Sequence, residues 1–231
     1  MPTPSSDHRT DGSQNIKGVP VTPDLYAYVL AHNPPLDPVQ RELIETTQTK
    51  LGDAAIMQVA QEQAPLLAFL VRLTRARHVV EVGTFTGLSA LAMAQALPED
   101  GTLVACDKSE EWTVYGREAW AKAGVADRVD LRIGDALETL NAMPEEPHID
   151  VAFLDADKES YVAYWEALVP RMREGGVIAV DNVFLQGRVQ DPSASGQAAA
   201  MRAFNDHVSA DKRMEAVMLT VADGLTLARK R

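Results

Sequence analysis

Short apolar runs alternate with longer amphipathic stretches along the chain from residue 78 onward. The runs have the length of strands buried on both faces, and the stretches between them are long enough for helices. This alternation is typical of parallel strands joined by crossover helices, so it predicts an α/β fold. The predicted parallel strands are residues 78–82, 102–106, 129–133, 149–154 and 177–180.

The pattern changes at both ends of this region. An amphipathic helix is expected over residues 197–208, followed by strands at 214–220 and 225–228. The turn signal Ala222-Asp223-Gly224 between these strands favours an antiparallel hairpin. Before residue 78, Pro23 opens one short helix, and Asp37-Pro38-Val39-Gln40 provides a cap, a first-turn proline and a capping-box glutamine for the next. A further helix is expected over about 54–73.

The first 20 residues are polar and rich in Pro, Ser, Gly and Asp, so we expect a flexible arm, with a lid that orders over a ligand as the alternative. They lack the apolar core of a secretory signal. The chain of 231 residues suits one domain, with helices over 22–75 and a ligand-binding α/β core over 78–231.

Acidic residues stand at or just after the carboxyl end of every predicted parallel strand. Ligands of open α/β sheets bind in the crevice beyond those ends, so these carboxylates are expected to meet in one cleft. They are Glu81, Asp107, Asp135, Asp155 and Asp181. Asp135 has an equally good explanation as a helix cap, because Glu138 follows it at capping-box spacing.

Composition narrows the choice of partners. With 33 acidic and 22 basic residues the formal charge is −11, which argues against a nucleic-acid partner. No apolar run approaches the roughly 20 residues of a membrane-spanning helix. Cys106 is the only cysteine, so a reducing cytoplasm is expected, and a buried thiol is favoured over a reactive one. The five histidines lack the i, i+4 spacing of helix-borne metal ligands.

Gly83 and Gly87 flank a turn between the first strand and the following helix. Their spacing fails the pyrophosphate fingerprint and lacks the P-loop lysine, which argues against dinucleotide and nucleoside triphosphate ligands. Asp107 ends the second strand near the place where a carboxylate binds ribose hydroxyls in such folds. A nucleoside cofactor without a diphosphate is therefore favoured.

A second cluster follows the fourth and fifth strands. Asp155, Asp181 and Asn182 offer hard oxygen donors that suit Mg²⁺ or Ca²⁺ better than zinc. Lys158 lies three residues after Asp155. A neighbouring cation would lower its pKa and make it a usable base, although a solvated lysine in a first helical turn is the simpler alternative.

Six sequence blocks occur in an order that resembles the cation-dependent class I O-methyltransferases, the caffeoyl-CoA and catechol O-methyltransferase-like enzymes. The similarity covers about residues 39–231. The blocks are residues 81–87, 105–107, 123–128, 155–158, 181–182 and 223–229. The resemblance implies a Rossmann-like fold with a seven-stranded, mostly parallel sheet, helices on both faces, and the C-terminal antiparallel hairpin.

The resemblance also implies a site. S-adenosylmethionine is the expected cofactor, Mg²⁺ the expected metal with Ca²⁺ or Mn²⁺ as alternatives, and Lys158 the base or orienting residue, acting with Asp155. The implied metal ligands are Asp155, Asp181 and Asn182. The implied cofactor-binding residues are Val59, Glu81, Gly83, Thr84, Ser89, Asp107, Asp135, Ala136, Asp155 and Tyr164.

The expected reaction is methyl transfer to a hydroxyl of a small ortho-dihydroxy aromatic acceptor. Relatives commonly carry tryptophan where this chain has Leu185, which predicts an acceptor pocket of different shape. An acyl-CoA-linked phenylpropanoid is one alternative, and hydroxyuridine of transfer RNA, disfavoured by the negative charge, is another. A non-catalytic binding protein is the third. Because relatives are often homodimers, a homodimer is expected.

Overall fold

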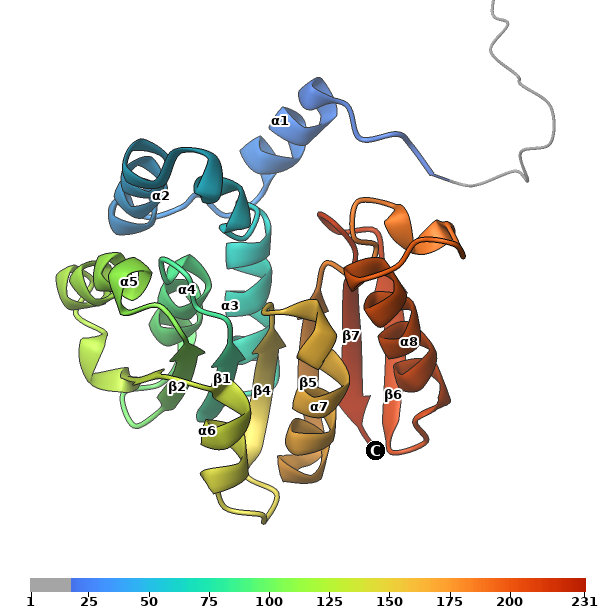
Figure 1. The fold of residues 1–231 in the computed structure, drawn as a ribbon. Helices are drawn as coiled ribbons and strands as arrows, with labels where there is room; N and C mark the ends of the chain where they lie inside the picture. The colour runs from blue at the N-terminus through green and yellow to red at the C-terminus, as the bar shows by residue number, and fades with distance from the viewer. Residues whose placement is uncertain (1–17) are drawn as a thin grey trace, which may run out of the picture.

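A computed structural model describes residues 18–231; the predicted arm therefore lies outside the described residues, apart from residues 18–20. Helices precede the sheet, as the proline and capping signals predict, and Asp37 and Gln40 form the expected capping box (Figure 1). These first elements are α1 (Pro23–His32), α2 (Pro38–Leu51), the 3-10 turn η1 (Gly52–Met57) and α3 (Gln63–Leu73).

Seven strands form one sheet in the order β3-β2-β1-β4-β5-β7-β6. The strands from β1 to β5 run parallel, and β7 pairs antiparallel with both β5 and β6. This confirms the predicted α/β fold with its C-terminal hairpin. The strands are β1 (His78–Val82), β2 (Thr102–Asp107), β3 (Val129–Ile133), β4 (Ile149–Leu154), β5 (Met172–Asp181), β6 (Met214–Leu219) and β7 (Leu225–Lys230).

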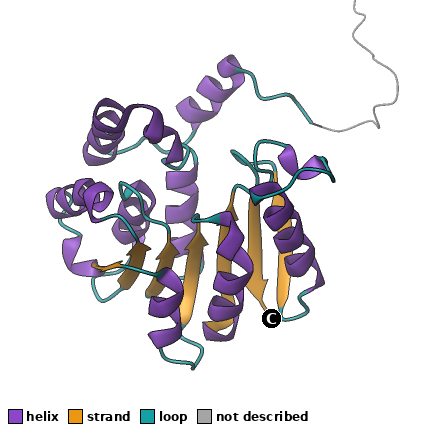
Figure 2. Ribbon diagram, viewed as in Figure 1, coloured by secondary structure: helices purple, strands orange, loops and turns teal. Residues whose placement is uncertain are grey.

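Helices cover both faces of the sheet (Figure 2). Successive side chains of a strand point to opposite faces, so Val79 packs with α2 to α5 while Val80 packs with α6 to α8. The remaining helices are α4 (Leu88–Ala96), α5 (Glu110–Lys122), α6 (Ala136–Ala142), α7 (Tyr161–Leu168) and α8 (Gln197–Ala210). Short 3-10 turns lie in the connections between these helices and the strands. They are η2 (Ala126–Arg128), η3 (Lys158–Ser160), η4 (Val169–Arg171) and η5 (Arg188–Gln190).

Two predicted boundaries need correction. The helix expected over 54–73 is α-helical in its second half only, because residues 54–57 belong to the 3-10 turn η1 and residues 58–62 form an irregular segment before α3. Gly52, with φ of 51°, ends α2 and starts this departure from helix. Strand β5 begins at Met172, five residues before its predicted start at 177. Gly175 and Gly176 concealed its first half, since glycine is a weak strand former.

Candidate functional site

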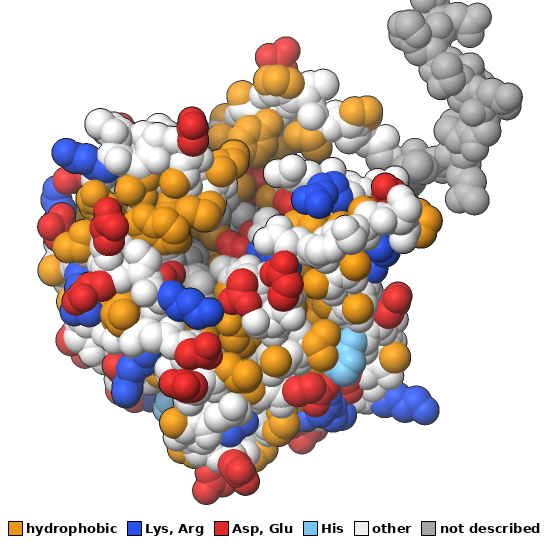
Figure 3. Space-filling model, viewed as in Figure 1, with side chains coloured by type: hydrophobic (Ala, Val, Ile, Leu, Met, Phe, Trp, Pro, Cys, Tyr) orange, Lys and Arg blue, Asp and Glu red, His pale blue; other side chains and the backbone are white. Residues whose placement is uncertain are grey.

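A cavity of about 1030 Å³ opens at the carboxyl ends of the parallel strands. Strand β1 lies between β2 and β4, so the cavity sits where the strand order reverses, the usual ligand position in an open α/β sheet. Loops after β1, β2, β4 and β5 form one side, and the η1–α3 segment and α1 form the other. Figure 3 shows the surface hollowed below α1, with acidic side chains visible inside the hollow.

The turn after β1 approaches the loop after β4 closely at Gly83. A Cβ atom at this position would lie 1.8 Å from the carbonyl oxygen of Asp155, and the φ of Gly83 is +89°. Only glycine fits here, because any side chain would collide with main chain and would also be strained at this φ. The predicted glycine turn therefore brings the cofactor motif and the metal motif into contact.

Asp107 orients the same turn. Its Oδ2 atom accepts hydrogen bonds from the main-chain N–H groups of Thr84 (2.9 Å) and Phe85 (2.7 Å), and its Oδ1 atom from Ser109 (2.7 Å). Each carboxylate oxygen has two lone pairs, so capacity for a ligand hydroxyl remains. Asp107 and Thr84 both line the cavity, and their role in binding a cofactor stays a prediction.

Glu81 lies beneath the cavity surface. It is fully buried, neither carboxylate oxygen has a hydrogen-bond partner among residues 18–231, and it is not among the residues that line the cavity. Burial raises its pKa to about 8, and the nearby Asp107 and Asp155 carboxylates add to that rise. The hydroxyls of Ser89 and Thr84, which do line the cavity, oppose it. Glu81 therefore lies beneath the cavity wall, and Ser89 and Thr84 stand between it and the cavity.

Asp155 and Asn182 meet around the ammonium group of Lys158. Lys158 Nζ donates to Asp155 Oδ1 (3.0 Å), to Asn182 Oδ1 (2.6 Å) and to the hydroxyl of Tyr161 (2.7 Å). The Lys158 and Asp155 side chains are only 11% and 16% exposed. Oxygens from the ends of two adjacent strands thus converge on one positive charge.

Asp181 borders this group and is 3% exposed. Burial raises its pKa to about 6, and repulsion from the Asp155 carboxylate contributes to the shift. Its Oδ1 atom accepts a hydrogen bond from the main-chain N–H of Asn182 (2.7 Å). Asp155, Asp181, Asn182 and Lys158 all line the cavity. The two carboxylates and the amide oxygen are the kind of oxygen donors that a hard divalent cation prefers. The Lys158 ammonium supplies a positive charge between two of them.

The remaining predicted cofactor residues divide into two groups. Val59, Ser89, Ala136 and Tyr164 line the cavity, and Tyr164 donates to the Asp157 carboxylate (2.8 Å). Asp135 does not line it. Its Oδ1 atom instead accepts from the main-chain N–H groups of Leu137 (2.8 Å) and Glu138 (3.4 Å), so Asp135 caps α6, the alternative that the sequence offered.

Several residues of the site carried no sequence signal of their own. Tyr161 fixes the Lys158 ammonium, although its position three residues after Lys158 was compatible with this role. Trp112 lines the cavity and packs edge-on against the ring of Phe85. Tyr26 brings α1 over the cavity by donating to Glu62 Oε2 (2.5 Å). Their place depends on contacts between distant segments, which spacing does not reveal.

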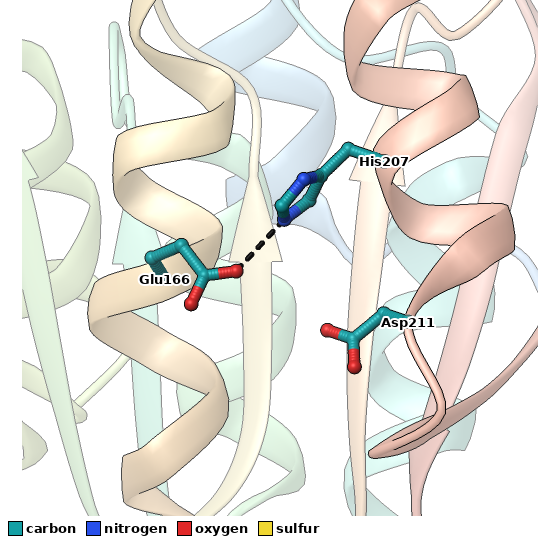
Figure 4. A group of neighbouring side chains, drawn as sticks. All are labelled: Glu166, His207 and Asp211. Atoms are coloured by element: carbon teal, nitrogen blue, oxygen red, sulfur yellow. Dashed lines mark hydrogen bonds and ion pairs between the residues drawn. The ribbon is translucent and has the colours of Figure 1, made fainter.

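A second group of polar side chains lies away from the cavity. Figure 4 shows Glu166 on α7 facing His207 on α8, with Asp211 just beyond α8. His207 Nε2 is 2.7 Å from Glu166 Oε1, and Arg213 Nη2 lies 2.7 Å from both that oxygen and Asp211 Oδ2. The Arg213 guanidinium forms ion pairs with both carboxylates. The cluster therefore joins α7, α8 and the start of β6 as an ion-pair network.

The sequence and the fold of this chain are similar to those of known proteins. A family model described as O-methyltransferase matches residues 32–231. A "Probable caffeoyl-CoA O-methyltransferase 1" of Dictyostelium discoideum is 40% identical over 208 residues, which cover 88% of this chain and 90% of that protein. The "Catechol O-methyltransferase domain-containing protein 1" of Mus musculus is 39% identical, covering 89% and 79%. An O-methyltransferase of Bacillus cereus, solved "in complex SAH", superposes with a TM-score of 0.81 at 30% identity and covers 89% and 96%.

Proposed function

The chain belongs to the O-methyltransferase family, and from this premise we propose that it methylates a hydroxyl of a small ortho-dihydroxy aromatic acceptor with the help of a divalent cation. It is an S-adenosylmethionine-dependent O-methyltransferase with a class I methyltransferase fold. The acceptor and the cation are the proposed part.

The observation that carries the proposal is the position of the Lys158 ammonium. It occupies a point to which Asp155 Oδ1 and Asn182 Oδ1 both direct lone pairs, with the Asp181 carboxylate close by. These three residues would hold Mg²⁺ through hard oxygen donors and leave positions open for two adjacent acceptor oxygens. When bound, the cation supplies Lewis acidity that favours the phenolate over the phenol, whose ordinary pKa is ~10.

The chain's own residues supply orientation and proton transfer. The turn held by Asp107 and Gly83 would hold the methyl donor, S-adenosylmethionine, against the floor of the cavity. Lys158 Nζ, anchored by Tyr161, would take the proton that the acceptor hydroxyl loses only as the neutral amine, a form that a divalent cation bound beside it would favour. Such placement of reacting groups accounts for much of the acceleration expected in a group-transfer enzyme.

The apolar part of the cavity wall suits an aromatic acceptor. Leu185, at the position where relatives carry tryptophan, lines the cavity together with apolar residues of η1 and the side chain of Tyr26. The name of the Mus musculus relative contains catechol, which supports a free ortho-diphenol. The name of the Dictyostelium relative contains caffeoyl-CoA, so a phenylpropanoid thioester is the competing acceptor.

A methylation assay tests the proposal. Purified protein is incubated with S-adenosylmethionine and Mg²⁺, and each of a free catechol, a matched monophenol, caffeoyl-CoA and hydroxyuridine-containing transfer RNA is supplied in turn. We expect turnover of the catechol alone, loss with EDTA, and recovery when Mg²⁺ is restored. Asp155→Ala is expected to abolish turnover, whereas Asp206→Ala, an exposed position on α8, leaves it unchanged. Full turnover in EDTA or equal turnover of the monophenol would refute the role of the cation.

A further inference from the structure

Three polar side chains from separate segments meet beside the cavity in a closed triangle of hydrogen bonds. Gln58 Nε2 donates to the hydroxyl oxygens of Thr47 and Thr86, both at 2.9 Å, and the two threonine oxygens lie 3.0 Å apart. Thr47 lies on α2 and Thr86 in the turn after β1, and neither has any exposed surface. The sequence assigned none of the three residues to a site.

Every donor of this triangle has an acceptor. The two amide hydrogens of Gln58 go one to each threonine oxygen. The Thr47 hydroxyl has one hydrogen and two acceptors within reach, the main-chain oxygen of Leu43 (2.8 Å) and the Thr86 oxygen (3.0 Å). When it donates to Leu43, the Thr86 hydroxyl can rotate and donate to Thr47. A buried polar network that is satisfied in this way holds its members in one arrangement.

The triangle connects the two sides of the cavity. Gln58 and Thr86 both line the cavity. Gln58 begins the irregular segment 58–62 on one side, and Thr86 lies between Gly83 and Gly87 in the turn on the other. Because the segment is neither helix nor strand, side-chain hydrogen bonds hold it in place. The bond from Gln58 to Thr86 therefore fixes the distance between the segment and the turn.

The turn after β1 needs support from more than one direction. Phe85 has a φ of +51°, a left-handed conformation that is costly for a residue other than glycine. Asp107 at the end of β2 holds the turn through the main-chain N–H groups of Thr84 and Phe85. Thr86, the next residue, is held from α2 and from the segment 58–62. Strained backbone of this kind persists only where the surrounding contacts fix it.

We propose that Gln58 and Thr47 are positioning residues for the cofactor, which keep the segment 58–62 and the turn after β1 at the spacing that S-adenosylmethionine requires. Thr47 does not line the cavity, so it acts through Gln58 and Thr86. This inference rests on the proposed place of the methyl donor against the turn, and it involves neither the cation nor the acceptor. Without the triangle only a fraction of the molecules would hold the binding arrangement, and the apparent affinity would fall by that fraction.

Variants of Thr47 test the inference through the binding of S-adenosylhomocysteine, measured by calorimetry without metal or acceptor. Thr47→Val keeps the shape of the side chain and removes its hydroxyl, whereas Thr47→Ser keeps the hydroxyl. We expect Thr47→Val to bind the ligand about tenfold more weakly, and Thr47→Ser to bind it within about twofold of the wild type. Thr49→Val, at an exposed position on the same helix, is the matched control and should bind as the wild type does.

These results distinguish positioning from packing. Urea unfolding first establishes that each variant is folded under the conditions of the binding measurement. A residue that only stabilises the fold would then leave the affinity for S-adenosylhomocysteine unchanged. Folded Thr47→Val with wild-type affinity would therefore overturn the inference. Equal weakening in Thr47→Ser and Thr47→Val would overturn it as well, because the hydroxyl would not be the group that matters.

Gln58→Met keeps the test decisive if Thr47→Val fails to fold. Gln58 is only half-buried, and methionine keeps the length of its side chain while removing both amide donors. We expect about tenfold weaker binding of S-adenosylhomocysteine. The double variant with Thr47→Val should bind no more weakly than Gln58→Met alone, because both residues act through one network. Wild-type affinity in Gln58→Met, or additive losses in the double variant, would overturn this inference alone.

A variant of Asp107 separates this inference from the premise on which it rests. Asp107→Asn disturbs the same turn from β2, because its amide cannot accept from both main-chain N–H groups as the carboxylate does. It should also weaken the binding of S-adenosylhomocysteine. Wild-type affinity in Asp107→Asn would overturn the proposed place of the cofactor against the turn, and this inference with it.

Discussion

Glu81 should make the cofactor-free protein less stable as the pH rises. Folding moves the pKa of this carboxyl from 4.5 to about 8, chiefly through burial. Because the folded pKa is the higher one, the folded state binds the proton more tightly. Stability is therefore full below pH 4.5, falls as the pH rises from there to about 8, and is constant above that. The change of pKa corresponds to about 5 kcal/mol at the upper limit.

The variant Glu81→Gln removes this titration and keeps a side chain of similar size. Relative to the wild type, its free energy of unfolding should increase by about 4 kcal/mol between pH 5 and pH 9, which follows from the two pKa values. Urea unfolding in EDTA, without cofactor and at several pH values, measures this difference. Glu215→Gln, at an exposed position on β6, serves as the control and should show no such trend.

The expected change in unfolding free energy is large enough for urea unfolding to detect or exclude. If the difference in unfolding free energy between Glu81→Gln and the wild type changes by less than about 1 kcal/mol over this pH range, the carboxyl is not held neutral by burial. Glu81→Gln should lose more affinity for S-adenosylmethionine than for its thioether product, because only S-adenosylmethionine carries a sulfonium charge, which would draw Glu81 into its ionised form. Loss of an ionisable group from a functional site is a common source of this exchange between stability and activity.

Three other changes have expected outcomes. Gly83→Ala should destabilise the protein by about 3 kcal/mol or more in urea unfolding, because its Cβ would collide with the main chain after β4. The control Gly52→Ala should cost about 1 kcal/mol, because its added Cβ would meet no described atom within 4 Å. Trp165→Phe removes the 2.8 Å hydrogen bond from the indole to Asp211 Oδ2 and should cost about 1.5–3 kcal/mol; equal urea midpoints would contradict this. Burial raises the pKa of the Cys106 thiol to about 12, so iodoacetamide should not alkylate the native protein at pH 8, and rapid labelling seen by mass spectrometry would disprove this.

The sequence predicts the α/β core well because its signals are local. A run such as Ile149–Leu154 is buried along its whole length and is apolar except for Asp150, so its hydrophobicity marks the strand and its end. Strand ends then place Asp107, Asp155 and Asp181 at one edge of the sheet. The α/β fold therefore follows from the pattern, whereas the seven-stranded topology came from the family resemblance.

The sequence pattern does not predict side-chain positions that depend on contacts between distant segments. Gln63 lies on a helix outside the α/β alternation, and only tertiary packing brings it to the cavity. Asp135 lies near the carboxyl end of its strand, as the other acids lie near theirs, yet its side chain turns back to cap α6. Glu81 has the expected place in the chain, but its burial beneath the cavity surface depends on how α4 packs on the sheet.

The order of the last two strands has a consequence for how the protein is made. Within the part of the chain that the structure describes, strand β6 pairs with β7 alone, and β7 in turn connects it to β5. A ribosome releases β6 before β7, so during synthesis β6 exists for a time with no partner in the sheet. Because unpaired edges promote association between chains, the nascent protein passes through a stage that is prone to aggregation. Chaperone demand during expression should therefore be concentrated late in translation.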